Sequence, residues 1–123
     1  MIFFVWGLAF AHREPVDYVS ALVKRKTDEI QVLAARESLE RAVEEGEAFS
    51  RDVISHPKMY YELALLYNKK ERLKDALRYY ARALELDPKM KAALYDRAEI
   101  YLAQEDYDRA YADLIQAKDI EHW

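Results

Sequence analysis

The sequence predicts an all-α fold made of helical hairpins. Only two glycines and three prolines are available for turns in 123 residues, whereas a β-rich chain would need turn residues about every 8–12 positions. Hydrophobic residues make up 52% of the chain and charged residues 34%, as in globular proteins. The second half of the chain also aligns with itself at a fixed shift, described below. We therefore expect an almost entirely helical chain that contains an internal repeat.

Composition disfavours several classes of function. The chain has no cysteine, which excludes a disulfide framework, a thiol nucleophile and a thiolate metal site. Its formal net charge of -4 does not suggest the concentrated basic surface that is typical of nucleic-acid-binding domains. We therefore expect neither redox chemistry nor a nucleic-acid partner.

Residues 1–11, "MIFFVWGLAFA", form an uncharged apolar segment that ends at the polar "HREP". As a helix, eleven residues span about 16 Å, too short to cross a hydrocarbon core of about 30 Å. The segment is then a secretory signal cleaved before His12, a membrane anchor, or a helix buried in a neighbouring subunit. We favour retention, which predicts a membrane-associated protein or a subunit of a membrane-bound complex. The alternative is a periplasmic or secreted protein.

Residues 12–56 are expected to form a helical region that caps the array after it. The pattern predicts a short helix between Pro15 and Lys26, and then one long amphipathic helix over residues 28–55. The small residues of this second helix, Ala35, Ala42 and Gly46, would allow another helix to approach closely. Apolar positions alternate in steps of three and four along this second helix: Val32, Ala35, Leu39, Ala42, Gly46, Phe49 and Val53.

Residues 57–123 contain two copies of a 34-residue pattern, at 57–90 and 91–123. The shift pairs Tyr61 with Tyr95, Ala64 with Ala98, Tyr67 with Tyr101, Glu71 with Glu105, Ala76 with Ala110, and Ala83 with Ala117. A 34-residue period of paired helices is the signature of the tetratricopeptide repeat. The first copy resembles that family at Tyr60, Leu63, Ala64, Tyr67, Ala76, Tyr80, Ala83 and Pro88. The second departs from it, with Arg97 in place of a leucine and His122 in place of the proline.

The residue types of the repeat have physical reasons. Two antiparallel helices approach closely where a side chain is small, as at Ala64 and Ala76, and larger side chains fill the space around the crossing. We expect that interior to contain Leu63, Tyr67, Leu73, Leu77 and Tyr80, whereas Tyr79, which aligns with Asp113, is expected to lie toward solvent.

Residues that are typical of helix ends predict where the helices begin and end. Ser55 is a candidate cap with Pro57 in the first turn, and Pro88 ends a later helix. The pattern predicts helices near 57–70, 73–86, 90–103 and 106–120.

The two ends of the array differ in how they are covered. About three units are normally needed for stability. The front is closed by the preceding helical region, whereas Tyr107, Tyr111 and Leu114 are expected to be partly uncovered at the rear. Self-association or a larger assembly would cover them, and a shortened chain would equally explain a missing capping helix.

The family resemblance implies a concave groove lined by the first helix of each repeat, which holds a peptide or a partner helix. Residues at the corresponding positions are Lys58, Tyr61, Leu65, Asn68 and Lys69 in the first repeat, and Tyr95, Glu99 and Leu102 in the second. A surface that mixes aromatic and aliphatic groups suits an amphipathic segment. The alternative occupant is the N-terminal helix of the same chain.

Two subclasses of such proteins are disfavoured. Chaperone-binding relatives clamp a C-terminal carboxylate with a lysine and an asparagine, but Tyr61 and Leu65 stand at those positions. A related class with a 35-residue period reads RNA, but the 34-residue register and the acidic charge argue against it.

No constellation of catalytic residues emerges. His12, His56 and His122 are far apart in sequence and lie at predicted element edges, and two glycines cannot build a phosphate-binding loop. We therefore predict a non-enzymatic protein-binding scaffold without cofactor or metal. It is membrane-associated or part of a membrane-bound complex; the alternative is an exported soluble repeat protein that binds a peptide or envelope partner after cleavage.

Overall fold

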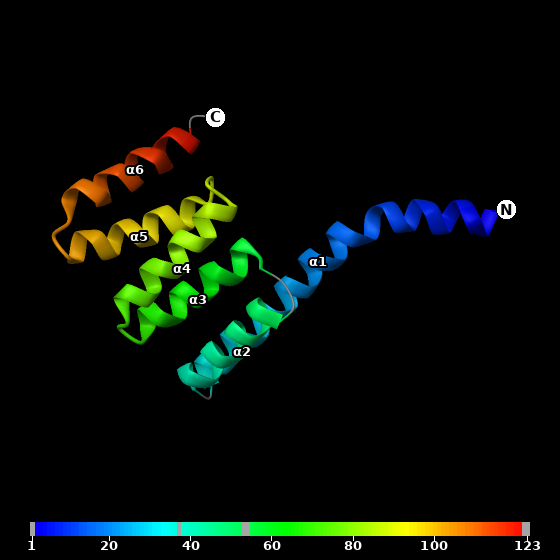
Figure 1. Cartoon of the computed structure of the whole chain (residues 1–123), viewed down its shortest axis with the longest axis horizontal. Helices are drawn as coiled ribbons and strands as arrows, with labels where there is room; N and C mark the ends of the chain where they lie inside the picture. The colour runs from blue at the N-terminus through cyan, green and yellow to red at the C-terminus, as the bar shows by residue number, and fades with distance from the viewer. Residues whose placement is uncertain (1, 37, 53–54, 122–123) are drawn as a thin grey trace.

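The computed structural model describes the backbone of residues 2–36, 38–52 and 55–121, and the side chains of residues 18–36, 38–52 and 55–120. The described residues form six helices and no strand (Figure 1). They are α1 (Ile2–Arg36), α2 (Leu39–Asp52), α3 (Pro57–Lys69), α4 (Leu73–Leu86), α5 (Lys91–Ala103) and α6 (Tyr107–Glu121). The predicted all-α class is confirmed, and the four predicted helices of the repeats agree with α3 to α6 to within one residue.

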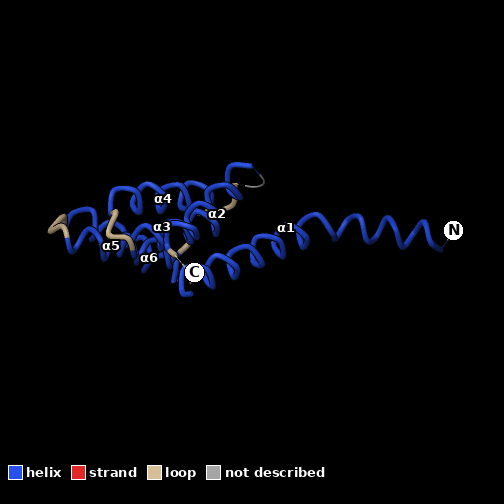
Figure 2. Tube along the Cα trace, turned by 90° about the horizontal axis from the view of Figure 1, so that it is seen from below, coloured by secondary structure: helices blue, strands red, loops and turns tan. Residues whose placement is uncertain are grey.

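Consecutive helices pair into three hairpins that stack along one direction (Figure 1). Direct hydrogen bonds define the two sides of this stack. Gln31 of α1 bonds to α3, and Tyr61 of α3 bonds to Asp96 of α5, so the first helices of the hairpins are neighbours. On the other side, Tyr79 of α4 donates a hydrogen bond to Glu47 of α2. The first part of α1 extends beyond the stack in both views (Figures 1 and 2).

The turn inside each hairpin is closed by the same backbone hydrogen bond. The N–H of Arg72 donates to the carbonyl of Tyr67 at 3.0 Å, and one repeat later that of Asp106 donates to Tyr101 at 2.8 Å. The first hairpin contains the same bond one repeat length earlier, where Ser38 donates to Leu33 at 3.1 Å. This six-residue loop satisfies a carbonyl left open at a helix end. The α1–α2 hairpin therefore closes with the same hydrogen bond as the repeats, although its sequence lacks the pattern.

The predicted continuous helix over residues 28–55 is wrong, because the chain turns between Arg36 and Leu39. Ser38 stabilises the new start: its Oγ accepts from the N–H of Arg41 at 3.5 Å, and its carbonyl accepts from Ala42. Val32, at 54% exposed, lies outside the core that the stripe predicted for it. The short helix predicted before it is part of α1, so His12 lies inside a helix, not at an element edge.

The core runs through all three hairpins and is built from alanines at the crossings with larger side chains between them. Ala42, Ala76 and Ala110 recur at the spacing of the repeat and are at most 1% exposed. Gly46 likewise allows a close approach where α1, α2 and α3 meet. A Cβ placed there would lie 2.9 Å from Cδ2 of Leu63 and 3.2 Å from Cδ1 of Ile30. The predicted close approach at Gly46 is therefore present. The apolar stripe predicted for one helix is divided between α1 and α2, and its last member, Val53, lies outside the described residues.

Helix α3 begins with a cap that the sequence reading misassigned. The Nδ1 atom of His56 accepts a hydrogen bond from the N–H of Lys58 at 3.2 Å, and Pro57 occupies the first turn. Ser55 instead places its Oγ 2.8 Å from the hydroxyl of Tyr60. His56 is half-buried, and burial, followed by the charge of Lys58, lowers its pKa. A neutral His56 retains the Nδ1 acceptor that this cap requires.

No helix in the described part of the chain is long and apolar enough to cross a membrane.

Candidate functional site

The eight predicted groove residues lie on α3 and α5, which are linked by the hydrogen bond between Tyr61 and Asp96. We call their accessible surface the first-helix face. Its exposed members are Lys58, Lys69, Tyr95, Glu99 and Leu102, and its half-buried members are Tyr61, Leu65 and Asn68. Tyr95 is 37% exposed and Leu102 is 45% exposed, so α5 carries most of the accessible apolar surface of this face.

Tyr61 is held in place by the next repeat. Its hydroxyl donates to Oδ2 of Asp96 at 2.6 Å, and its ring lies 6.0 Å from that of Tyr80. Burial, and then the bonded carboxylate of Asp96, raise the pKa of Tyr61, so its hydroxyl stays protonated as a donor. Tyr61 therefore joins two repeats and forms part of the floor of the first-helix face.

Below this face, Glu62 is a buried acid between α1 and α3. It is 6% exposed, and its Oε1 accepts from Nε2 of Gln31 at 3.0 Å. Burial raises the pKa of Glu62 despite this hydrogen bond. The pair fixes α1 beside α3, as the first helix of its own hairpin.

Tyr80 is fully buried, as its place in the repeat predicts, but its hydroxyl has no hydrogen-bond partner among the described residues. Burial, and then the negative charge of Asp96, raise its pKa. An unsatisfied hydroxyl in the core reduces stability. The position aligns with Leu114 in the second repeat.

The prediction that Tyr79 faces solvent is wrong. Its ring stacks between those of Tyr60, at 6.0 Å, and Tyr67, at 5.4 Å, and is half-buried. Its hydroxyl donates to Oε1 of Glu47 on α2 at 3.1 Å, and the hydroxyl of Tyr67 donates to the same oxygen. The alignment with Asp113 missed this role because the partner Glu47 comes from the preceding hairpin.

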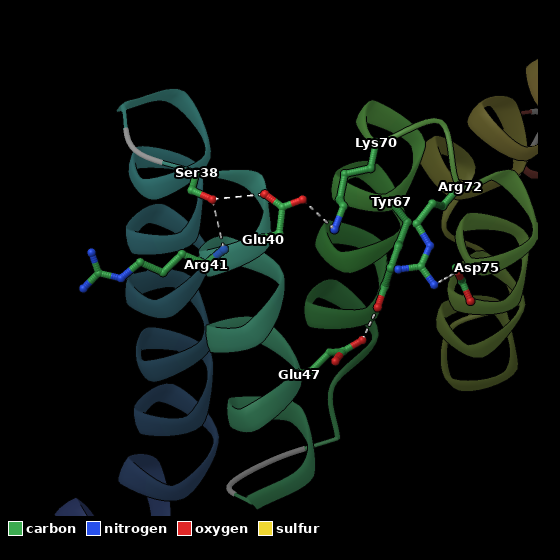
Figure 3. A network of polar contacts seen from close by, with 8 residues as sticks. All are labelled: Ser38, Glu40, Arg41, Glu47, Tyr67, Lys70, Arg72 and Asp75. Atoms are coloured by element: carbon green, nitrogen blue, oxygen red, sulfur yellow. Dashed lines mark hydrogen bonds and ion pairs between the residues drawn. The ribbon is translucent and has the colours of Figure 1, made fainter.

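Polar contacts tie the first repeat to α2 (Figure 3). Glu47 approaches Tyr67 from α2, and Nζ of Lys70 at the end of α3 lies 3.3 Å from Oε1 of Glu40. The guanidinium of Arg72 lies 5.1 Å from the centre of the Tyr67 ring and pairs with Asp75 at 2.7 Å. The neighbouring hairpin thus supplies the carboxylates that meet Tyr67 and Lys70 of the first repeat.

The second repeat contains a buried ion pair instead. Nε and Nη2 of Arg97 on α5 donate to both carboxylate oxygens of Asp113 on α6, at 2.8 and 2.7 Å. The side chain of Arg97 is 19% exposed and that of Asp113 is 6% exposed. Hydrogen bonding to Asp113 raises the pKa of Arg97. Arg97, identified in the sequence only as a departure from the pattern, therefore has a partner on the next helix.

The last helix leaves aromatic side chains accessible. Tyr107 is 62% exposed, Tyr111 is 67% exposed and Leu114 is half-buried, on the rear face that the sequence predicted to be partly uncovered. Within the described parts of the chain, no group of three or more metal-ligating acidic or histidine side chains is placed to hold an ion.

Comparison with known proteins identifies the fold. Residues 57–90 match the family model of the tetratricopeptide repeat, which confirms the resemblance seen in their spacing. No curated protein matches the chain in sequence. It is similar to the solved structure described as "MamA 41-end from Desulfovibrio magneticus RS-1", at 17% identity, 94% of this chain, 72% of that chain and a TM-score of 0.72. A second structure, "MamA RS-1 ArsTM double mutant", gives the same identity, share of this chain and TM-score, with 71% of its own chain covered.

These findings define a helical-repeat protein in which residues 57–90 are a tetratricopeptide repeat. At 17% identity, the likeness to the two solved structures concerns the fold. Stacked helical repeats present extended surfaces to other proteins, so the fold supports a role in protein–protein interaction.

Proposed function

We propose that this protein is a non-enzymatic scaffold that holds a peptide or helix of a partner protein on its first-helix face. The observation that carries the proposal is the exposure of Tyr95 and Leu102 on α5, above a floor fixed by the bond between Tyr61 and Asp96. Accessible aromatic and aliphatic side chains on a rigid support bind with little loss of side-chain entropy.

The charges on this face favour an amphipathic partner. Lys58 and Lys69 are exposed near the two ends of α3, and Glu99 is exposed on α5 between Tyr95 and Leu102. A segment with an apolar stripe flanked by charged residues would bury the stripe and keep the charges hydrated. The direct packing of α1 beside α2 and α3 supports a partner from outside the chain as the occupant.

The proposal is tested with a double variant, Tyr95→Ala with Leu102→Ala. Affinity capture with the full chain, followed by quantitative mass spectrometry, should recover a partner whose yield falls about tenfold or more for this variant, because interface anchors carry most of the binding energy. A matched control, Tyr107→Ala with Tyr111→Ala, truncates two exposed tyrosines on α6 and should leave the yield unchanged. Equal loss from both variants, or retention by the first, would contradict the proposal.

We also propose that residues 1–11 attach the scaffold to a membrane or a membrane-bound complex. The support is the segment itself, which is uncharged and mostly apolar and continues within α1 into a polar stretch. Eleven such residues can insert part-way into a bilayer without spanning it.

Vesicle flotation tests attachment to lipid directly. The full chain should float with phosphatidylcholine–phosphatidylglycerol vesicles, and Phe4→Asp with Leu8→Asp should stay in the dense fraction. If both proteins float equally, the apolar segment is not the anchor. If neither floats, attachment to lipid is excluded, which leaves a neighbouring subunit or a cleaved signal as the explanation of the segment.

A further inference from the structure

The side of the stack opposite the first-helix face carries a cleft of about 410 Å³ between α2 and α4. Its lining includes cationic and hydroxyl groups from three helices and the segment before α3. The residues that matter for its chemistry are Ser50, Arg51, Ser55, Tyr60, Arg78 and Arg82. No motif in the sequence signals this cleft, because the whole of α3 separates its two main walls along the chain.

Two arginines are placed one helical turn apart on the α4 wall. The guanidinium of Arg82 lies 5.9 Å from the centre of the Tyr60 ring, and that of Arg78 lies 5.2 Å from the centre of the Tyr79 ring. Arg51 faces the same cleft from α2. Like charges one turn apart on a helix repel each other, and a bound anion would offset that repulsion.

Two of the three guanidinium groups, those of Arg51 and Arg78, form ion pairs with acidic neighbours. Nε of Arg51 lies 3.1 Å from Asp52, and Nη2 of Arg78 lies 3.2 Å from Asp75. Both arginine side chains are more than half exposed in these pairs, at 71% and 60%, so the pairs add little stability. A guanidinium has five N–H donors in a fork that suits an oxyanion, so one such contact leaves other donors available.

Hydroxyl groups add neutral donors beside the cations. The Ser55 Oγ and the Tyr60 hydroxyl lie 2.8 Å apart, and Ser50 lines the cleft next to them. The bond to Ser55, with smaller contributions from Ser50 and the charge of Arg82, lowers the pKa of Tyr60. The pKa of Tyr79 is instead raised, first by burial and then by Glu47. The Tyr60 end of the cleft therefore combines the guanidinium of Arg82 with hydroxyl groups, whereas Tyr79 lies against Glu47.

Glu47 is the one carboxylate among the described side chains that line the cleft. It accepts hydrogen bonds from the hydroxyls of Tyr67 and Tyr79, which hold it at the wall. Among the described residues of the lining, three guanidinium groups thus meet one carboxylate, and Asp52 and Asp75 beside the lining pair with Arg51 and Arg78.

We propose that this cleft binds an oxyanion carried by a peptide, with Arg78 and Arg82 as its principal ligands. The oxyanion is the carboxylate of an acidic residue or the phosphate of a phosphorylated one, since both match the planar fork of arginine. The cleft lies on the opposite side of the stack from the first-helix face, so this proposal stands independently of the proposed function.

The experiment is an NMR titration of the arginine Nε–Hε resonances of the full chain. Three probes are compared at constant ionic strength: inorganic phosphate, a blocked tetraglutamate peptide, and a blocked peptide that carries one phosphoserine. We expect saturable shifts at Arg78 and Arg82 with at least one peptide, and none at Arg36, which is exposed at the end of α1. The peptide that binds identifies the source of the oxyanion.

Variants separate a built site from general charge attraction. Arg82→Gln should weaken peptide binding about tenfold, Arg82→Lys should weaken it less, and Arg36→Gln should leave it unchanged. Glu47→Gln should strengthen binding several-fold, because it removes the opposing charge and keeps an acceptor for the tyrosines. Circular dichroism confirms that each variant is folded.

Three results would overturn the proposal. One is binding of inorganic phosphate without either peptide, since the site would then take an inorganic ion only. Another is an equal loss for Arg82→Gln and Arg36→Gln, since the attraction would then be non-specific. The third is unchanged or weaker peptide binding by the folded Glu47→Gln variant.

Discussion

The two repeats have the same turn geometry and differ in the side chains that fill the interior of each hairpin. Both turns close with the same hydrogen bonds, and Glu71 and Glu105 adopt the same left-handed conformation there, with φ of 61° and 59°. Where the first repeat has Leu63 and the stacked Tyr79, the second has Arg97 and Asp113, joined as an ion pair. Small residues at the crossings and the turn hydrogen bonds therefore set the repeat geometry, and the interior can be aromatic or ionic.

The two repeats also differ in where their polar partners come from. Tyr79 of the first repeat donates to a carboxylate of α2, which belongs to the preceding hairpin. Arg97 of the second repeat pairs with Asp113 on α6, inside its own hairpin. The first repeat thus obtains a polar partner from its neighbour, whereas the second contains both members of its pair.

The largest expected effect comes from breaking the ion pair of the second repeat. Asp113→Ala leaves Arg97 charged and partly desolvated, and should lower the free energy of unfolding by about 3–5 kcal/mol, as measured by urea denaturation. Asp119→Ala, on the exposed side of the same helix, should change it by less than about 0.5 kcal/mol. Arg97→Leu with Asp113→Leu should recover most of the loss. Equal effects of the two single variants would mean that the pair adds nothing to stability.

A smaller effect of opposite sign is expected at Tyr80. Tyr80→Phe removes a buried hydroxyl that lacks a partner among the described residues, and should raise the free energy of unfolding by about 1 kcal/mol. Tyr67→Phe removes a hydroxyl that donates to Glu47, and should lower it by about 1 kcal/mol. Thermal unfolding of the two variants side by side measures the contrast. A destabilised Tyr80→Phe would show that the hydroxyl has a partner in solution.

The buried acid of the first repeat gives a pH-dependent difference. Because burial raises the pKa of Glu62, the folded protein binds the proton of Glu62 more tightly than the unfolded chain does. Its contribution to stability is therefore full below the usual range for a glutamate, and is lost as the pH rises through the raised value. Glu62→Gln should be at least as stable as the wild type at neutral pH, and should lose that advantage as the pH falls.

Urea midpoints at a series of pH values measure this difference. Glu99→Gln, exposed on α5, is the control for the removal of one negative charge. A Glu62→Gln variant whose difference from the wild type does not change with pH would contradict the raised pKa.

The smallest effects are expected in the turns. Glu71→Gly and Glu105→Gly each relieve a left-handed conformation that costs about 1–2 kcal/mol for a residue with a side chain, less the entropy cost of glycine. Each should raise the free energy of unfolding by about 0.5 kcal/mol, and by similar amounts because the two φ angles agree. Gln104→Gly, at a residue with φ of -87°, should lower it. Calorimetry of the three variants would contradict this if glycine stabilised all positions alike.

The sequence predicted the repeats better than the region before them. In the repeats, alanine spacing, Pro57 and Pro88 are strong local signals, and the helices fall within a residue of their predicted bounds. Before them, apolar spacing continues through Ser38 without interruption, so periodicity alone could not place the turn. The repeat spacing between Ala42 and Ala76 was the available signal, and the missing aromatic pattern concealed it.

For the candidate sites, the limit was contact between distant helices. The eight residues of the first-helix face follow from repeat position, and their binding role stays a prediction. The bond from Tyr61 to Asp96 and the stacking of Tyr79 do not follow, because each depends on how neighbouring helices are set against one another. The same holds for the cleft between α2 and α4.

By itself, the sequence determined the helical class, the 34-residue register and the close approaches at the alanines. These depend on local properties: helix propensity, turn residues and side-chain size. Only the tertiary structure decided that α1 and α2 form a first hairpin, that Glu47 serves the tyrosines of another repeat, and that Arg78 and Arg82 face a cleft against α2. These features depend on contacts between side chains of different helices. Such contacts form only when the hairpins pack, so local patterns in the sequence do not reveal them.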